Sequence, residues 1–241
     1  MNSPERGIIK FIDRDSRRIE FDYGGFQLNY PLNAIPESLY NALATLVDGS
    51  EEPMQIYGQM VRNSVYKPAV ISNEQIKPFG VNAATKIVRL TLTDDEIEKR
   101  INEIEGVMLT FQGRPFEDTM SQRIELYKEL LIDDNKIDRM RLGVAEMFGL
   151  RTYNNLLHDP RCSLAFSWYD SDSGQSLGFQ INCLVEIVHQ GDPFYRYMRV
   201  MRSLFSRRFL DLEHEEYICA YKMFISEVID KSLASSTGFS H

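Results

Sequence analysis

A pair of apolar segments separated by a short polar stretch most constrains the fold of this chain. Residues 162–168 and 177–188 are rich in β-branched, aromatic and small apolar side chains, and the turn-forming run Asp170-Ser171-Asp172-Ser173-Gly174 lies between them. Two such segments joined by turn residues are typical of a β-hairpin. The pair therefore predicts an antiparallel sheet, and with it a mainly β fold of the α+β class.

The first 80 residues predict a small barrel. Residues 18–23 alternate polar and apolar side chains with period two, as a strand with one buried face does, and residues 7–12 and 26–30 also predict strands. A helix is expected from Pro36 through Val47, because Leu39, Leu43 and Leu46 fall on one helical face. Two further strands are expected over residues 54–61 and 69–76. This order is compatible with an SH3-like or OB-like barrel over residues 1–80.

A second, larger domain is expected over residues 87–232, after a linker of residues 80–86 that contains Gly, Asn and Ala. Thr93 followed by acidic residues predicts the start of a helix, which Gly106 would end. The segment 121–132 fits both strand alternation and helical spacing, and a strand is favoured. The other expected strands are residues 107–111, 140–148 and 217–229, the other expected helices are residues 152–158 and 194–209, and residues 233–241 are expected to form a flexible tail.

The charge and cysteine content exclude several classes of function. The chain carries 27 basic and 35 acidic side chains, a net charge of -8, which argues against general affinity for nucleic acid or anionic membranes. Residues 1–6 are polar with no apolar signal region after them, and no apolar run is long enough to span a membrane, so a cytoplasmic location is expected. Cys162, Cys183 and Cys219 form no metal-ligand spacing and are expected to be reduced, buried thiols.

One segment resembles a known family. In residues 151–164, Asn155-Leu156 is followed by Asp159-Pro160-Arg161 and then by a predicted strand. This run is similar to a segment of the pyridoxamine-5'-phosphate-oxidase-like family, in which a short helix leads into a core strand. The order of elements extends the resemblance over residues 93–230. The resemblance implies a split β-barrel with flanking helices that binds FMN between the two subunits of a homodimer and often acts as a flavin-dependent oxidoreductase.

The resemblance also implies which residues would hold the cofactor. Arg151, Thr152 and Asn155 would lie at the FMN phosphate, since a helix start offers free backbone N–H groups and a positive dipole end. Arg123 or Arg141, on segments upstream that are expected to be strands, would assist. The chain has Thr152 where the family commonly places a phosphate-binding lysine. The alternative is an ordinary capped helix beside a solvated arginine.

A different function is suggested by the predicted helix 194–209. Arg196, Arg199 and Arg202 recur every third residue along it, which places them on one stripe. Such a stripe could dock nucleic acid or an acidic partner, so the alternative function is a non-enzymatic regulatory or binding protein. The simpler interpretation is a solvated face paired with nearby glutamates. No nucleophile motif, P-loop or dinucleotide fingerprint is present, so no catalytic residue is predicted.

Overall fold

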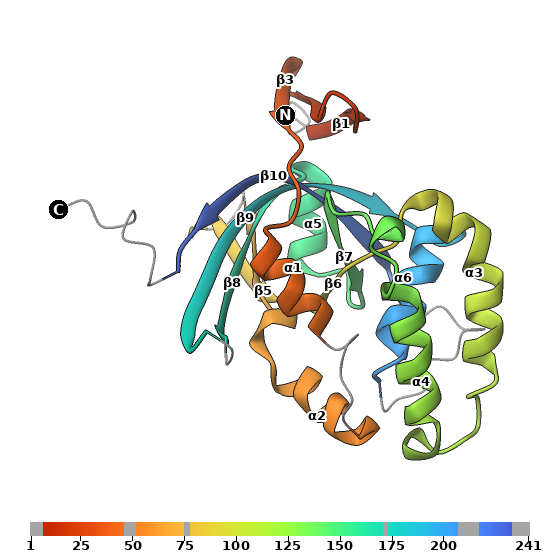
Figure 1. The fold of residues 1–241 in the computed structure, drawn as a ribbon. Helices are drawn as coiled ribbons and strands as arrows, with labels where there is room; N and C mark the ends of the chain where they lie inside the picture. The colour runs from red at the N-terminus through yellow and green to blue at the C-terminus, as the bar shows by residue number, and fades with distance from the viewer. Residues whose placement is uncertain (1–6, 46–51, 75–77, 171–172, 207–216, 233–241) are drawn as a thin grey trace.

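The chain folds around a curved antiparallel sheet that wraps around a group of helices (Figure 1). The computed structural model describes residues 7–45, 52–74, 78–170, 173–206 and 217–232, and within them the fold is of the α+β class, as predicted. Seven strands form the large sheet, in the spatial order β5 (Val81–Thr85), β4 (Ala69–Asn73), β8 (Arg161–Asp170), β9 (Gln175–Val188), β10 (Cys219–Asp230), β7 (Arg141–Glu146) and β6 (Val88–Arg89).

The hairpin of β8 and β9 forms the centre of the large sheet and confirms the prediction from the two apolar segments. The two strands pair from Arg161 opposite Leu184 to Asp170 opposite Gln175. Side chains alternate along β8, so that Leu164 and Phe166 enter the main core while Ser163 lies on the other face. The large sheet therefore has an apolar inner face, covered by helices, and a more polar outer face.

Six α-helices occur in the described part of the chain. They are α1 (Glu37–Ala44), α2 (Pro53–Arg62), α3 (Asp94–Leu109), α4 (Phe116–Leu131), α5 (Arg151–His158) and α6 (Pro193–Ser203), with short 3₁₀ turns η2 (Ser64–Tyr66) and η3 (Asp134–Lys136). The predicted helices at α1, α3, α5 and α6 are confirmed, but α6 ends at Ser203 and does not continue through residues 204–206 as predicted. Thr93 caps α3 as expected, because its hydroxyl accepts a hydrogen bond from the Glu96 N–H.

Two segments predicted as strands are helices. Residues 54–61 belong to α2, where Ile56 and Met60 are four residues apart and both buried. Residues 121–131 belong to α4, where Ile124, Tyr127 and Leu131 form a buried helical stripe. In both segments the buried apolar side chains have helical spacing. This spacing decides the structure, although the same segments also show a weaker alternation of polar and apolar residues.

Two predicted boundaries are also wrong. Gly106 does not end α3, because the buried stripe continues through Ile104 to Met108, and one glycine costs a helix only about 1 kcal/mol. The strand expected over residues 107–111 is therefore absent. The expected linker of residues 80–86 instead contains β5, which pairs with β4 from Ala69 opposite Thr85 to Asn73 opposite Val81.

A separate N-terminal barrel is not confirmed. Strands β1 (Gly7–Asp13), β2 (Arg18–Tyr23) and β3 (Phe26–Pro31) form as predicted, but they make a three-stranded sheet of their own. Gly24 and Gly25 have positive φ angles of 59° and 82°, which the tight turn between β2 and β3 requires. Strand β4, expected to complete the barrel, pairs with β8 of the large sheet.

The small sheet packs on the outer face of the large sheet. Ile19, Phe21 and Leu32 form a second core with Leu184 of β9 and Phe224 of β10. The segment of residues 32–36, here called the connector, then passes the point where β7 and β10 separate and continues into α1. On this path the Asn33 N–H donates to the Ile225 carbonyl at 2.7 Å, and the Ile35 N–H donates to the Arg139 carbonyl at 2.8 Å.

Some predictions fall on residues that the structure does not describe. Residues 207–209 of the predicted helix 194–209 and the predicted tail of residues 233–241 lie outside the described ranges. Across the part of the chain that is described, none of the helices combines the length and the apolar character needed to span a membrane.

Candidate functional site

A cleft of about 890 Å³ lies on the outer face of the large sheet, bounded by the connector and the end of β3. Its floor is formed by strands β4, β8, β9 and β10. Because these four strands are neighbours in the sheet, side chains from distant parts of the sequence lie next to one another there. The polar side chains that line it are Tyr30, Asn33, Asn73, Arg161, Ser163, Gln180, Asn182, Ser226 and Glu227.

A row of hydrogen-bonded polar side chains crosses the floor of the cleft. Asn182 of β9 stands opposite Ser163 of β8 and Glu227 of β10 in the strand register. The Asn182 amide oxygen accepts from the Ser163 hydroxyl at 2.6 Å and from the Gln180 amide at 3.1 Å, and its amide nitrogen donates to the Glu227 carboxylate at 2.5 Å. This row offers both donors and acceptors to a ligand that lies on the sheet.

Arg161 is held at the edge of this row by a buried carboxylate. Asp159, only 2% exposed, accepts from the Arg161 Nε at 2.8 Å, the Arg161 Nη2 at 2.9 Å and the Asn73 amide at 2.8 Å. The Arg161 guanidinium also lies over the ring of Tyr23, 4.7 Å from its centroid. The bidentate hydrogen bond to Asp159 and the stacking on Tyr23 fix the orientation of the guanidinium, so Arg161 is preorganised within the cleft.

Ionised carboxylates of this kind make the stability depend on pH. Burial alone would raise the pKa of Asp159 and of Glu146, but hydrogen bonds outweigh it and hold both pKa values below the usual range. For Asp159 these bonds come from Arg161 and Asn73. For Glu146 they come from Lys86, the Phe148 N–H and Tyr221.

We expect the melting temperature to fall as the pH drops from about 6 to 3. The unfolded chain binds protons near the ordinary carboxyl pKa of about 4, whereas the folded chain resists protonation. The stabilisation is therefore complete above that pH and is lost as the pH falls toward the lowered pKa values. Thermal melts from pH 7 to 3 measure this loss of stability. In Asp159→Asn the melting temperature should fall less between pH 6 and 3 than it does in the wild type. A wild-type melting temperature that is constant down to pH 3 would contradict the assignment.

The residues predicted to cradle a phosphate lie together on α5, but protein side chains already bind them. Arg151 forms an ion pair with Glu74, the Thr152 hydroxyl accepts from the Asn82 amide at 3.2 Å, and the Asn155 amide donates to the Ser72 hydroxyl at 3.0 Å. Thr152 is only 3% exposed. These contacts attach α5 to β4 and β5, and none of the three residues lines the cleft.

Arg123 does not join Arg151 either. It is buried on α4, where its guanidinium donates to the Thr119 hydroxyl at 2.7 Å and to the Ser203 and Leu204 carbonyls at 3.1 and 3.2 Å. These carbonyls lie at the C-terminal end of α6, which a cation stabilises. The role of Arg123 in the fold is to join α4 to α6, and its expected assistance to a phosphate at α5 has no support in these contacts.

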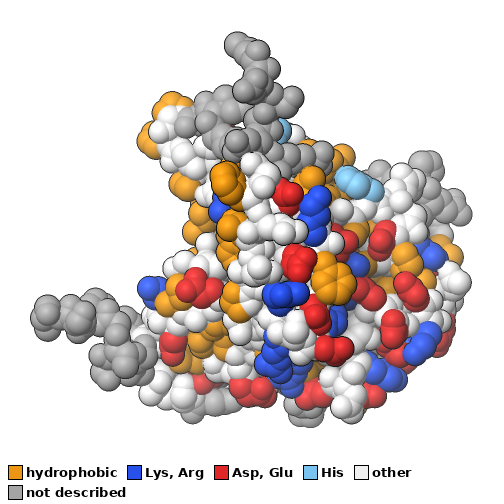
Figure 2. All heavy atoms as spheres, turned by 90° about the horizontal axis from the view of Figure 1, so that it is seen from above, with side chains coloured by type: hydrophobic (Ala, Val, Ile, Leu, Met, Phe, Trp, Pro, Cys, Tyr) orange, Lys and Arg blue, Asp and Glu red, His pale blue; other side chains and the backbone are white. Residues whose placement is uncertain are grey.

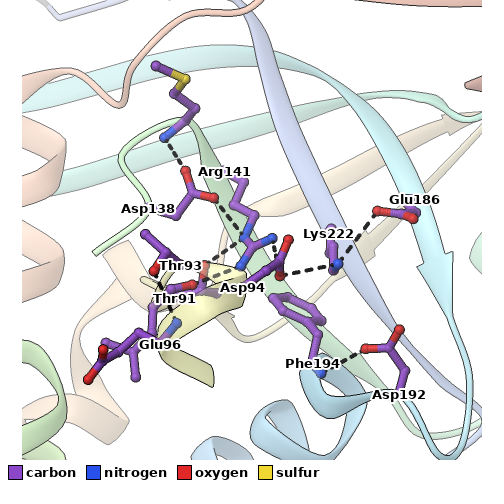
Figure 3. Close-up of polar contacts among 12 residues, drawn as sticks. Thr91, Thr93, Asp94, Glu96, Asp138, Arg141, Glu186, Asp192, Phe194 and Lys222 are labelled. Atoms are coloured by element: carbon purple, nitrogen blue, oxygen red, sulfur yellow. Dashed lines mark hydrogen bonds and ion pairs between the residues drawn. The ribbon is translucent and has the colours of Figure 1, made fainter. Parts of the chain in front are cut away.

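Arg141 is at the centre of a polar network between β7, β10 and α3 (Figure 3). Its fully buried guanidinium contacts the Asp138 carboxylate at 3.1 Å, the Asp94 carboxylate at 2.8 Å and the Leu92 carbonyl at 2.8 Å. Lys222 of β10 extends the network, 3.2 Å from the same Asp94 oxygen that Arg141 contacts. Every group is neutralised by its neighbours, so the prediction that Arg141 assists a phosphate at α5 is not supported.

The predicted arginine stripe is not an open docking face. Arg199 is only 6% exposed on α6, and Arg196 binds Glu105 and Asn102 of α3. Arg202 is half-buried. The helix packs against α3, β7 and β10, so Arg196 and Arg199 lie in contacts with the protein. Figure 2 shows acidic and basic side chains interspersed over the face seen from above.

The cysteines are free and buried, as expected. In the described part of the chain, no group of three or more histidine, cysteine or acidic side chains could hold a metal ion. The residues that sequence reasoning missed are Arg161, Asn182 and Glu227. Arg161 ends the Asp159-Pro160-Arg161 run, which was the available signal, whereas the row at Asn182 depends on strand pairing and has no motif.

Comparison with known proteins gives little further guidance. No protein-family model matches the sequence, and no curated protein matches it significantly. Among solved structures, the chain is similar to a putative pyridoxamine 5'-phosphate oxidase from Listeria innocua, with 10% sequence identity and a TM-score of 0.39 over 75% of this chain and 98% of that one. That protein bears the name of the family that the sequence resembles, but a likeness at this level does not establish a shared function.

Proposed function

We propose that the protein binds a small polar ligand in the cleft on the outer face of the large sheet, with FMN as the first candidate. The observation that carries the proposal is the preorganised Arg161 guanidinium beside the polar row at Asn182. A cleft of about 890 Å³ is in the range of small-molecule sites, and such sites place a few fixed polar groups against a larger surface.

The chemistry of FMN fits these residues. The flavin ring has an edge of carbonyl and N–H groups, which Asn182, Gln180 and Ser163 can match with amides and a hydroxyl. The phosphate requires a guanidinium donor, and Arg161 offers its Nη1 atom, since Asp159 binds the Nε and Nη2 atoms. The proposal thus moves the phosphate from the start of α5 to Arg161, six residues beyond Asn155. If FMN binds, it supplies the redox chemistry of an oxidoreductase, and the protein supplies binding and orientation.

The test is a titration of the purified protein with FMN and, separately, with riboflavin, which lacks the phosphate, followed by flavin fluorescence. We expect Arg161→Met to weaken FMN binding by roughly 10- to 100-fold, the equivalent of a lost charged hydrogen bond, and to change riboflavin binding far less. Asn182→Ala should weaken both ligands similarly. Arg18→Met, which removes an exposed arginine paired with Glu20, is the matched control.

Two results would refute the proposal for FMN. One is that neither flavin changes its fluorescence with the wild-type protein. The other is that FMN binds, and that Arg161→Met and Arg18→Met bind it equally well. The rival function, docking of an acidic partner through Arg196, Arg199 and Arg202, is not favoured by any contact of these residues. A homodimer stays a prediction, which the molecular mass in solution would test.

A further inference from the structure

Arg89 is a buried cation inside the fold, and it does not line the cleft. It ends the short strand β6 and stands opposite Gly143 of β7. The residue is 7% exposed, and its guanidinium lies 4.9 Å from the centroid of the Tyr66 ring. An arginine keeps its charge in proteins, so burial of this side chain costs several kcal/mol unless something compensates it.

No acidic side chain among the described residues compensates Arg89. Within the described residues it forms no ion pair, and its Nε atom has no hydrogen-bond partner. The single hydrogen bond of its guanidinium runs from Nη1 to its own neighbour, the Val88 carbonyl, at a long 3.4 Å. The buried Arg141, by contrast, contacts two carboxylates, a hydroxyl and a carbonyl. Most N–H donors of the buried Arg89 guanidinium thus have no hydrogen-bond acceptor among the described residues.

The surroundings of Arg89 add a second cation. Burial lowers the pKa of Arg89, the phenols of Tyr127 and Tyr66 oppose that change, and nearby Arg202 of α6 lowers the pKa further. Arg202 likewise forms no ion pair within the described residues. The buried Arg89 of β6 therefore lies beside the Tyr66 ring of η2, and the half-buried Arg202 of α6 and the buried Tyr127 of α4 are close enough to act on its charge. Two like charges repel, and no acidic side chain among the described residues forms an ion pair with either guanidinium, which indicates a site for a negative charge.

We propose that Arg89 and Arg202 bind a small oxyanion in the interior of the fold, between β6, η2, α4 and α6. The ligand is a phosphate- or sulfate-like ion or the carboxylate of a small molecule, each of which can accept bonds from a guanidinium fork. The site is separate from the cleft and does not depend on the identity of the cleft ligand. Its occupant joins α4 and α6 to the edge of the large sheet and so contributes to the stability of the fold.

The test has two readouts. The first is ion chromatography of the supernatant after acid precipitation of the purified protein, which detects an anion retained from expression. The second is a thermal melt with added phosphate, sulfate or acetate, each compared with chloride at equal ionic strength. At 100 times the dissociation constant, we expect a rise in melting temperature of roughly 5–10 °C. A larger rise with acetate than with phosphate or sulfate would identify the carboxylate class.

Arg89→Met should release no anion and show no selective rise, whereas the surface variant Arg18→Met should behave as the wild type does. If Arg89→Met does not fold, Arg202→Met provides the same comparison, with a reduced rise expected. The proposal is overturned if the wild type neither releases an anion nor shows a selective rise. It is equally overturned if Arg89→Met shows the same rise as the wild type.

Discussion

Replacement of Arg141 by Met is expected to lower the free energy of unfolding by about 3–5 kcal/mol, because it removes one partner from a buried network of charges. The Asp138 carboxylate, 3% exposed, would keep Arg14 as a partner but lose its contact with Arg141. The Thr91 hydroxyl and the Leu92 carbonyl would lose their donor. Urea unfolding followed by tryptophan fluorescence measures the loss, since Trp168 lies in the main core.

The matched control for Arg141→Met is Arg18→Met, which breaks an exposed pair with Glu20 and should cost no more than about 1 kcal/mol. The double variant Arg141→Met/Asp138→Asn should recover part of the lost stability, because it removes the carboxylate that the first change leaves underpaired. Equal losses for Arg141→Met and Arg18→Met would show that the buried network does not contribute to stability.

Replacement of Phe21 by Ala should cost about 3–5 kcal/mol, since its ring is fully buried between the small and the large sheet. It packs with Leu184 and Phe224, and it also borders the Arg161 guanidinium at 5.8 Å. The loss should detach the small sheet from the large one, so limited proteolysis should cut within residues 7–31 faster than in the wild type.

Phe26→Ala in the same small sheet is the control for Phe21→Ala. Phe26 is 72% exposed, so its truncation should change the stability by no more than about 0.5 kcal/mol and leave the cleavage pattern unchanged. If both variants are cut at the same rate, the small sheet does not rely on the packing of Phe21, and the second core does not attach it to the large sheet.

The parts of the fold that were predictable are those in which the local pattern and the tertiary environment agree. The hairpin of β8 and β9 was predictable because alternation, length and turn residues all indicate it. The α4 helix was not, because its apolar residues satisfy two periodicities, and only the position of the core chooses between them. The same holds for α2, where Pro53 at the helix start was the overlooked signal.

The candidate site was less accessible to sequence reasoning than the fold. Thr152 and Asn155 were correctly expected on one helix with Arg151 at its start, but the sequence does not reveal that Glu74, which follows the distant strand β4, binds Arg151. Ser163, Asn182 and Glu227 lie on three strands and meet only through their register. A bulge between Ile225 and Glu227 sets which residue of β10 faces Asn182, and such a shift of register has no local signature.

The path of the connector makes residues 7–36 inseparable from the rest of the molecule. From the small sheet on the outside of the large sheet, the chain passes the point where β7 and β10 separate and enters the interior as α1. The gap between these strands is therefore closed by a segment that is synthesised before either of them. In a protein shortened to begin after residue 36, the Ile225 and Arg139 carbonyls would lose the N–H donors of Asn33 and Ile35. Leu184 and Phe224 would become exposed to water. The small sheet and its connector thus cover the gap between β7 and β10 of the large sheet and do not form an independent module.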